Sequence, residues 1–384
     1  MAKTADIVII GGGIIGVSIA YYLGKMGAKN VVLFEKDLIG MGSTGLCAGG
    51  IRRQWSTEVN MHFAMKAFEV FQSFEEEFGA SPEFHQIGYL FLARDEEELE
   101  AFRKNVELQN RFGVPSELLT RGEVKNEWPF LNVEDIVGGA FCHTDGYAGP
   151  SEVTNAMAKG GRRFGVKIFE KAEVVSIEVK KNRIVSVTTR EERVETHTVV
   201  NAAGPYAALV GRLAGVEIPV SPIRRQLFVT DPFHKIPSSV PLTIDHKENF
   251  YFRREGECVL LSGPQDEKPS FNLNTDFEAM VITAEKAVHR VPVFEEVHIA
   301  RGWAGLYEIS PDNHAILGKV PEVEDFILAV GFSGHGFQHG PAAGMVIAEL
   351  ILNGKSESID IRPLSLSRFK EGKAIKESLT AFKD

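Results

Sequence analysis

The stretch DIVIIGGGIIGVSIAYYL at residues 6–23 decides the fold of this chain. The apolar run at 6–10 predicts a buried strand, the glycine-rich run at 11–16 a tight turn, and residues 17–23 a helix. Gly11 permits the turn, Gly13 lets the backbone approach a phosphate, and Gly16 lets the helix pack on the strand. Because the first N–H groups of such a helix point at an anion, the pattern predicts a dinucleotide-binding βαβ unit.

An acidic residue after the next apolar run supports this interpretation. Residues 31–34 predict a second strand, and Glu35 follows it directly, nineteen residues after Gly16. A carboxylate at this place can accept hydrogen bonds from the hydroxyls of an adenosine ribose. The alternative is a glycine-rich turn in an ordinary βαβ unit.

Composition narrows the class of protein. The 384 residues are enough for two domains, and the formal net charge of −10 shows no basic excess of the kind that nucleic acids or anionic membranes require. Cys47, Cys142 and Cys258 lie far apart, so neither a disulfide framework nor a metal site is expected. No apolar run reaches transmembrane length, and the early glycine motif leaves no room for a signal peptide. A cytoplasmic protein is expected.

A second glycine-rich turn near the other end of the chain shapes the domain prediction. A strand is predicted at 326–330 and a helix at 341–352, with a glycine-rich turn between them. Helices are also predicted at 64–78 and 151–165, and residues 220–300 are rich in strand patterns. The fold expected is α/β (α+β overall). A Rossmann-like domain would be formed by 1–80, 143–219 and 301–384, with a mainly antiparallel-sheet substrate domain (81–142 and 220–300) inserted discontinuously.

The two turns favour a flavin over a nicotinamide. A nicotinamide site usually needs only the first turn, whereas a flavin ring also needs a group that stabilises the negative charge of its reduced form. A helix N-terminus with exposed N–H groups does this, and Gly334–Gly336 lie just before the C-terminal helix.

Further motifs then identify a family. They are STGLCAGGIRR at 43–53, Asp145-Gly146 with Pro150, NAAGP at 201–205, RGWAGLYEISPD at 301–312 and GFSGHGF at 331–337. With these the chain resembles the D-amino-acid-oxidase-like FAD superfamily, in particular the β subunits of heteromeric sarcosine oxidases and of archaeal-type L-proline dehydrogenases. The resemblance implies FAD, a Rossmann-like FAD domain and a sheet-based substrate domain over the flavin.

The resemblance also implies roles for individual residues. Ser43 and Thr44 would contact the pyrophosphate and ribityl chain, the Val174 backbone the adenine, and residues 334–337 the pyrimidine edge of the flavin. The alternative for Val174 is a core residue of its strand, and the alternative for Ser43 is a helix cap. The full set of expected FAD-binding residues is Gly11, Gly13, Ile14, Ile15, Gly16, Glu35, Lys36, Ser43, Thr44, Ala48, Gly49, Gly50, Val174, Ala203, Gly204, Gly305, Gly334, His335, Gly336, Phe337 and Gln338.

Two departures from the family pattern bear on how FAD is attached. Gly305 stands where monomeric sarcosine oxidase-like enzymes have the cysteine that bonds to the flavin. Pro150 stands where the heterotetrameric β subunits have the histidine that carries covalent FMN. Non-covalent FAD is therefore expected.

Other departures concern the substrate side. The segment 258–262 lacks the lysine that helps oxidases react with oxygen, and Gln338 replaces a lysine that binds the substrate carboxylate. Arg52 or Arg53 could clamp that carboxylate instead, unless it is a surface arginine. Tyr251 would form an aromatic wall, unless it only packs within the sheet. The catalytic set expected is therefore Arg52, Tyr251 and Gln338, and no metal is expected at His335.

These features imply FAD-dependent oxidation of a secondary amino acid, of the L-proline or sarcosine type, to the imine by hydride transfer to flavin N5. A dehydrogenase is favoured over an oxidase. Alternatives are a glycine or D-amino-acid oxidase of the same fold, a flavin-bound partner subunit of a larger redox complex, and an FAD enzyme acting on glycerol phosphate. An α subunit or an electron-acceptor protein would be the partner, and an oligomer is expected.

Overall fold

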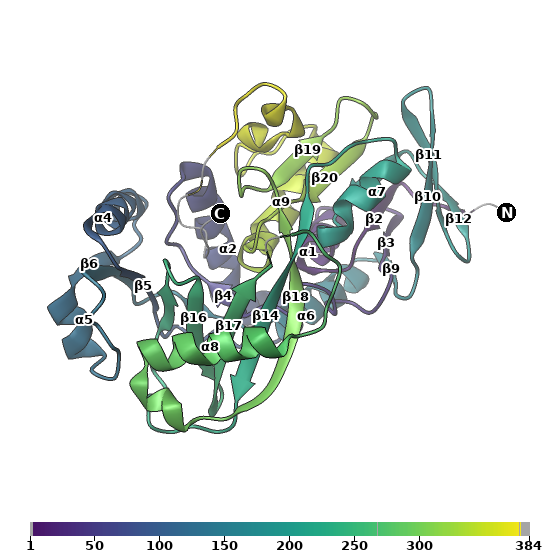
Figure 1. Cartoon of the computed structure of the whole chain (residues 1–384). Coiled ribbons are helices and arrows are strands. Elements are labelled where there is room, and N and C mark those ends of the chain that lie inside the picture. The colour runs from purple at the N-terminus through teal and green to yellow at the C-terminus, as the bar shows by residue number, and fades with distance from the viewer. Residues whose placement is uncertain (1–2, 267, 376, 378–384) are drawn as a thin grey trace.

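The computed structural model describes residues 3–266, 268–375 and 377, and two large sheets organise them (Figure 1). The first is a six-stranded sheet in which every neighbouring pair is parallel except β19 with β20. Its order is β19 (Ile316–Lys319), β20 (Phe326–Val330), β13 (Thr198–Asn201), β2 (Ile7–Ile10), β3 (Val31–Phe34) and β9 (Lys167–Phe169). This is the doubly wound arrangement that the opening stretch predicts.

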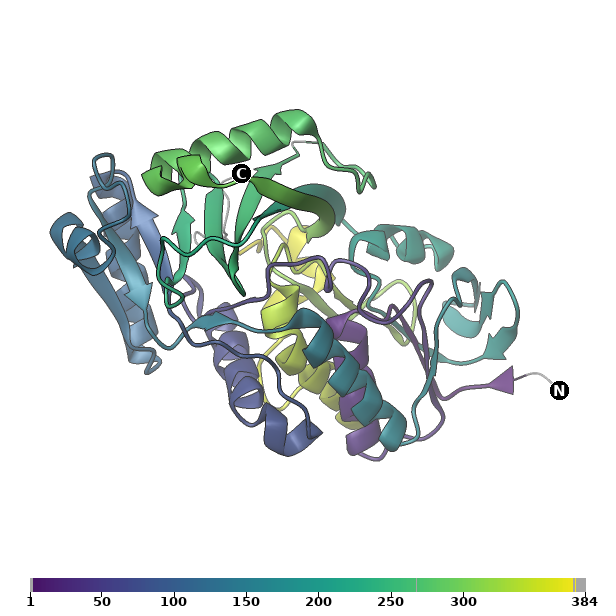
Figure 2. The ribbon, with the colours of Figure 1, turned by 90° about the horizontal axis from the view of Figure 1, so that it is seen from below.

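Both faces of this sheet are covered, which explains the unbroken apolar run of β2. Ile7 and Ile9 pack with four helices, whereas Val8 and Ile10 pack toward α7 and a smaller sheet. The four helices lie side by side in Figure 2: α1 (Ile14–Lys25), α2 (Glu58–Gln72), α6 (Pro150–Arg163) and α9 (Gly336–Asn353). The other face carries α7 (Ala207–Leu213), β1 (Lys3–Thr4), β10 (Val174–Lys180), β11 (Arg183–Thr189) and β12 (Arg193–Glu195).

The second large sheet has eight strands and is mainly antiparallel. Its order is β18 (Ile299–Ile309), β14 (Ser221–Thr230), β17 (Cys258–Gln265), β16 (Phe250–Glu255), β15 (Leu242–Asp245), β5 (Tyr89–Ala93), β7 (Gly138–Cys142) and β6 (Ser116–Thr120). α8 (Phe277–Arg290) lies across one face (Figures 1 and 2). β18, an edge strand of this sheet, spans the expected domain limit at residue 300.

Short elements complete the described chain. They are β4 (Gly50–Ile51) paired with β8 (Gly146–Tyr147), α3 (Phe74–Phe78), α4 (Glu96–Arg111), α5 (Arg121–Glu127), η1 (Gly204–Tyr206), η2 (Pro292–Glu296), η3 (Arg362–Leu364) and η4 (Leu366–Phe369). Among the described residues, no helix is both long enough and apolar enough to span a bilayer.

Two helix predictions differ from the structure. α9 begins at Gly336 rather than Pro341, so the proline lies inside the helix. Close packing on α1 holds this early turn, because a Cβ on Gly340 would come within 2.6 Å of Ile14. The helix expected at 64–78 is divided into α2 and α3 at Ser73, whose hydroxyl donates to the Glu69 carbonyl at 3.0 Å. Such a local side-chain bond competes with the helix ladder.

Candidate functional site

The first glycine turn lies between β2 and α1 and permits no side chain at two positions. Gly11 has φ +111°, and a Cβ there would lie 2.3 Å from the Ala202 carbonyl oxygen. A Cβ on Gly16 would lie 1.9 Å from the Gly11 carbonyl oxygen, so only glycine lets α1 approach the turn this closely. The sequence predicts that Gly16 lets the helix pack closely, and this short distance to Gly11 agrees with that prediction.

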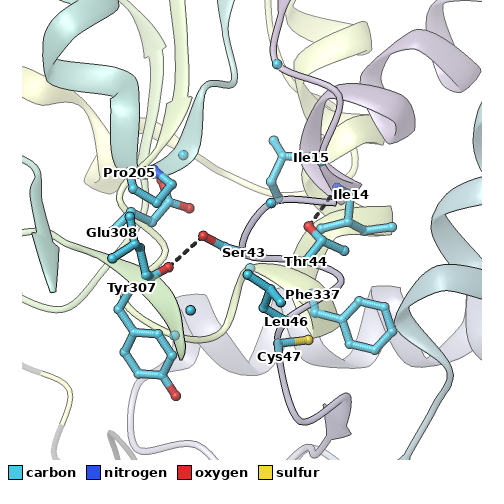
Figure 3. A pocket seen from close by; sticks show the side chains of 18 of the residues that line it. Ile14, Ile15, Ser43, Thr44, Leu46, Cys47, Pro205, Tyr307, Glu308 and Phe337 are labelled. Atoms are coloured by element: carbon cyan, nitrogen blue, oxygen red, sulfur yellow. Dashed lines mark hydrogen bonds between the residues drawn. The ribbon is translucent and has the colours of Figure 1, made fainter. Parts of the chain in front are cut away.

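The N-terminus of α1 is open toward an anion. Its N-cap, Gly13, provides no side-chain cap, and its first turn has no acidic residue. The Ile14 N–H donates to Thr44 Oγ1 at 3.1 Å, so a side chain from another segment satisfies this N–H (Figure 3). Glu35 fixes the turn itself: its Oε2 accepts from the Gly12 N–H at 2.6 Å and its Oε1 from the Asp37 N–H at 2.8 Å. This geometry can accommodate a phosphate group at Gly13, next to a carboxylate at the end of β3.

The second glycine turn presents the N-terminus of α9 in the same way. His335 is the N-cap and makes no side-chain cap bond. Its ring is 3% exposed, and its Nε2 has no hydrogen-bond partner among the described residues. Burial lowers the pKa of His335 well below its usual value, so the ring is neutral at pH 7. Gly334 has φ +92°, and a Cβ there would lie 2.7 Å from the Tyr307 ring.

One cavity of about 510 Å³ connects the two turns. Figure 3 shows Ser43, Thr44 and Ile14 on one side of it and Tyr307 and Glu308 on the other. Every residue expected to bind FAD or substrate lines this cavity except Gly16, which lies behind the turn: Gly11, Gly13, Ile14, Ile15, Glu35, Lys36, Ser43, Thr44, Ala48, Gly49, Gly50, Arg52, Val174, Ala203, Gly204, Tyr251, Gly305, Gly334, His335, Gly336, Phe337 and Gln338.

The structure distinguishes the two adjacent arginines. Arg52 lines the cavity and is 4% exposed, with its guanidinium centre 3.6 Å from the centroid of the Trp55 ring. The backbone N–H of Arg52 donates to Gln338 Oε1 at 2.9 Å, so Gln338 fixes the backbone at Arg52. Arg53 points elsewhere and pairs with the buried Asp145, with Nε 3.2 Å from Oδ1.

The cavity wall includes charged and aromatic residues that the sequence did not single out. Arg225 on β14 is 2% exposed, and its Nη1 donates to Asn249 Oδ1 at 3.1 Å. Burial lowers the pKa of Arg225 to about 10, so the group is still charged at pH 7. Tyr89, Trp55 and Tyr307 also line the cavity. Two neighbouring arginines at 224 and 225 in a strand-rich region could have indicated an anion-binding group in the sequence. Only the structure shows that Arg225 is the one that faces the cavity.

Glu308 is the other missed wall residue. Its Oε2 accepts from the Gly331 N–H at 2.9 Å, and Ser43 Oγ donates to the adjacent Leu306 carbonyl at 2.6 Å. Burial raises the pKa of Glu308 to about 7, against the opposing effect of the Gly331 and Phe332 N–H groups. The motif RGWAGLYEISPD contained this residue, but sequence alone did not show that its side chain faces the cavity.

These features fit an extended flavin dinucleotide. Two helix N-termini without a side-chain cap bond open on one cavity, and the buried His335 Nε2 on its wall has no hydrogen-bond partner in the described part of the chain. Gly42, on the same wall, has no atom within 4 Å of the position of a Cβ, so the backbone is open there. The described residues contain no cluster of three or more potential metal ligands.

Comparison with known proteins agrees with this geometry. A family model described as DAO, FAD dependent oxidoreductase, matches residues 6–350. The structure of L-proline dehydrogenase from P. horikoshii superposes with a TM-score of 0.90 at 35% identity, covering 97% of this chain and 99% of that one.

Two curated relatives extend the comparison. FAD-dependent oxidoreductase domain-containing protein 1 from Xenopus laevis is 31% identical, over 96% of this chain and 83% of its own length. Mitochondrial sarcosine dehydrogenase from Homo sapiens is 29% identical over 96% of this chain, but the match spans only 42% of the human protein. The resemblance and the fold class expected from sequence are thus confirmed: the chain belongs to the DAO family of FAD-dependent oxidoreductases, and FAD is its cofactor.

Proposed function

We propose that this chain oxidises a secondary amino acid, of the L-proline or sarcosine type, to the imine, as a dehydrogenase with non-covalently held FAD. The observation that carries the proposal is the buried Arg52 guanidinium on the wall of the cavity that joins the two glycine turns. Similarity to the L-proline dehydrogenase of P. horikoshii and to human sarcosine dehydrogenase supports this substrate class.

In this proposal Arg52 binds the substrate carboxylate through two parallel N–H···O bonds. Gln338 holds the backbone of Arg52, and Trp55 restricts its side chain. Tyr251 forms an aromatic wall that excludes water, and burial raises its pKa well above the usual value, so its hydroxyl stays protonated. The buried cations Arg52 and Arg225 on the cavity wall disfavour a second positive charge, so the amine binds uncharged.

The reaction breaks one C–H bond next to nitrogen and forms a C=N bond, while the nitrogen loses its proton. When bound, FAD supplies the acceptor for the hydride. The chain's own residues position the substrate and exclude water, which is where the protein contributes to such chemistry. No acid–base dyad is required once the amine is neutral.

Two residue choices favour a dehydrogenase that holds FAD without a covalent bond. Gly305 lines the cavity and offers no nucleophile to the flavin. β17 carries no lysine at 258–262, where oxidases have one. Acid precipitation should therefore release the yellow colour into the supernatant.

We assign the FAD-binding role to the cavity residues expected from sequence, within a domain formed by 1–80, 143–219 and 301–384. The substrate role falls to the domain formed by 81–142 and 220–300. An α subunit or an electron-acceptor protein would take the electrons onward, within an oligomer.

The test is anaerobic mixing of the FAD-loaded chain with L-proline, sarcosine, glycine and D-alanine in turn. Bleaching of the flavin by L-proline or sarcosine, with little peroxide formed in air, is expected. Bleaching by glycine or D-alanine alone, with rapid peroxide production, would favour the oxidase alternative. No bleaching by any of the four would contradict the proposal.

A further inference from the structure

A carboxylate near the C-terminus is buried against the start of a helix far away in the sequence. Glu377 is 4% exposed. Its Oε1 accepts from the Ser56 N–H at 3.1 Å and from the Ser56 hydroxyl, 321 positions away. Its Oε2 accepts from Thr57 Oγ1 at 3.1 Å and from Asn60 Nδ2 at 2.9 Å. Four donors thus converge on one side chain.

This carboxylate lies beside the N-terminus of α2, bonded to residues just before the helix and to one side chain in its first turn. The N-cap of α2 is Thr57, whose side chain makes no cap bond within the helix. A carboxylate at a helix N-terminus accepts from free N–H and hydroxyl donors and is stabilised by the helix dipole. Glu377 therefore anchors its own position in the chain to the beginning of α2.

The chain is also fixed at Arg368 and Ile375, shortly before Glu377. Arg368 is 2% exposed and forms two hydrogen bonds of 2.8 Å with the carboxylate of Asp312. The Ile375 N–H donates to the same carboxylate at 3.0 Å. Glu377 follows this fixed point by two residues, so its position at α2 is constrained from both sides.

A short chain of contacts leads from Glu377 to the cavity. Trp55 precedes Ser56, and its Nε1 donates to the Arg52 carbonyl at 3.2 Å. The same ring stacks under the Arg52 guanidinium, and Gln109 Nε2 donates to the Trp55 carbonyl at 3.1 Å. Burial lowers the pKa of Arg52, and the negative charge of Glu377 opposes that shift.

We propose that Glu377 is a positioning residue for Arg52, so that the C-terminal segment completes the substrate-carboxylate site. Glu377 fixes Ser56 and Thr57, these fix Trp55, and Trp55 holds the Arg52 side chain. The proposal rests on the proposed function, in which Arg52 binds the substrate carboxylate.

The test compares Glu377→Gln, Glu377→Asp and Arg52→Met with the control Glu371→Gln. Glu371 lies in the same segment but is exposed on the surface, where it pairs with Lys373. For Glu377→Gln the substrate KM and the Kd for acetate, a carboxylate probe, should rise about tenfold, the usual effect of losing a bond to a charged group. FAD affinity and kcat should change less than about twofold, because the bonds of Glu377 described above go to Ser56, Thr57 and Asn60, outside the two turns.

Glu377→Asp should recover part of the loss, because it restores the charge, and Glu371→Gln should match the wild type. An unchanged acetate Kd in Glu377→Gln, or equal losses of FAD affinity and acetate affinity, would overturn the proposal. Should Glu377→Gln fold poorly, Ser56→Ala removes a single donor, and an acetate Kd unaltered by it would count against the proposal.

Arg52→Met distinguishes failure of the proposed function from failure of the inference about Glu377. If it leaves acetate binding intact, the proposed role of Arg52 fails. If it weakens acetate binding while Glu377→Gln does not, only the inference about Glu377 fails.

Discussion

Replacing Gly16 with alanine should disable the phosphate-binding turn while leaving most of the fold intact. The added Cβ would lie 1.9 Å from the Gly11 carbonyl oxygen, so α1 and the turn must separate by about 1 Å. Neither side can yield easily. Gly11 already lies against the Ala202 carbonyl, and α1 is pressed against α9, where a Cβ on Gly344 would come within 2.4 Å of Ser18.

The magnitude follows from these contacts. Overpacking of this kind costs about 3 kcal/mol, and the gain in helix propensity from glycine to alanine returns about 1 kcal/mol. The free energy of unfolding of the FAD-free protein should therefore fall by about 2 kcal/mol. A shift of about 1 Å at the N–H groups that face the phosphates should weaken FAD binding about 100-fold.

Urea unfolding of the FAD-free protein measures the first quantity, and quenching of flavin fluorescence measures the second. The matched control is Gly122→Ala in the first turn of α5, where the nearest atom to a new Cβ is 3.9 Å away. That variant should gain about 0.5 kcal/mol and bind FAD normally. A Gly16→Ala protein that binds FAD within threefold of the wild type would refute the steric reasoning.

Substitutions at three further positions test the cavity wall and the buried ion pair. Glu308→Leu should raise the Kd for FAD about tenfold, because it removes acceptor oxygens from the cavity wall. The Kd of Glu308→Gln should stay within about threefold of the wild type. Fluorescence titration measures both Kd values, and equal effects of the two variants would argue against hydrogen bonding. Gln338→Ala should raise the substrate KM about fivefold, because the bond to the Arg52 backbone N–H is lost. Stopped-flow reduction of the flavin at varied substrate concentration measures this change. An unchanged KM would contradict the proposed role of Gln338. Although burial raises the pKa of Asp312, the Arg368 guanidinium and the Ile375 N–H hold it below the usual value. Its contribution to stability is therefore present above about pH 4 and is lost as pH falls below that value. Urea melts between pH 2.5 and 6 should show a weaker pH dependence in Asp312→Asn, which should also lose about 3 kcal/mol at pH 7 because Arg368 remains buried without its partner.

The sequence alone determined the features that depend on local chain geometry. A strand, a glycine turn and a helix in succession suffice to place phosphate-binding N–H groups, so residues 6–35 and the turn at 331–337 could be interpreted without a structure. The motifs spread along the chain identified the family for the same reason, since each is a short segment with its own backbone requirement. Even so, the rule that proline begins a helix placed the start of α9 five residues too late.

Only the tertiary structure decided which side chains share the cavity. Arg52 and Arg53 are neighbours that the sequence alone does not distinguish. Arg53 bonds to Asp145, 92 positions further along the chain, whereas Arg52 lines the cavity. Arg225 lies opposite Gly305 in the pairing of β14 with β18, and both residues line the cavity. Glu377 reaches α2 only because the chain returns across the molecule after Arg368. Contacts between distant segments depend on how whole elements pack, and no local pattern of residues specifies that packing.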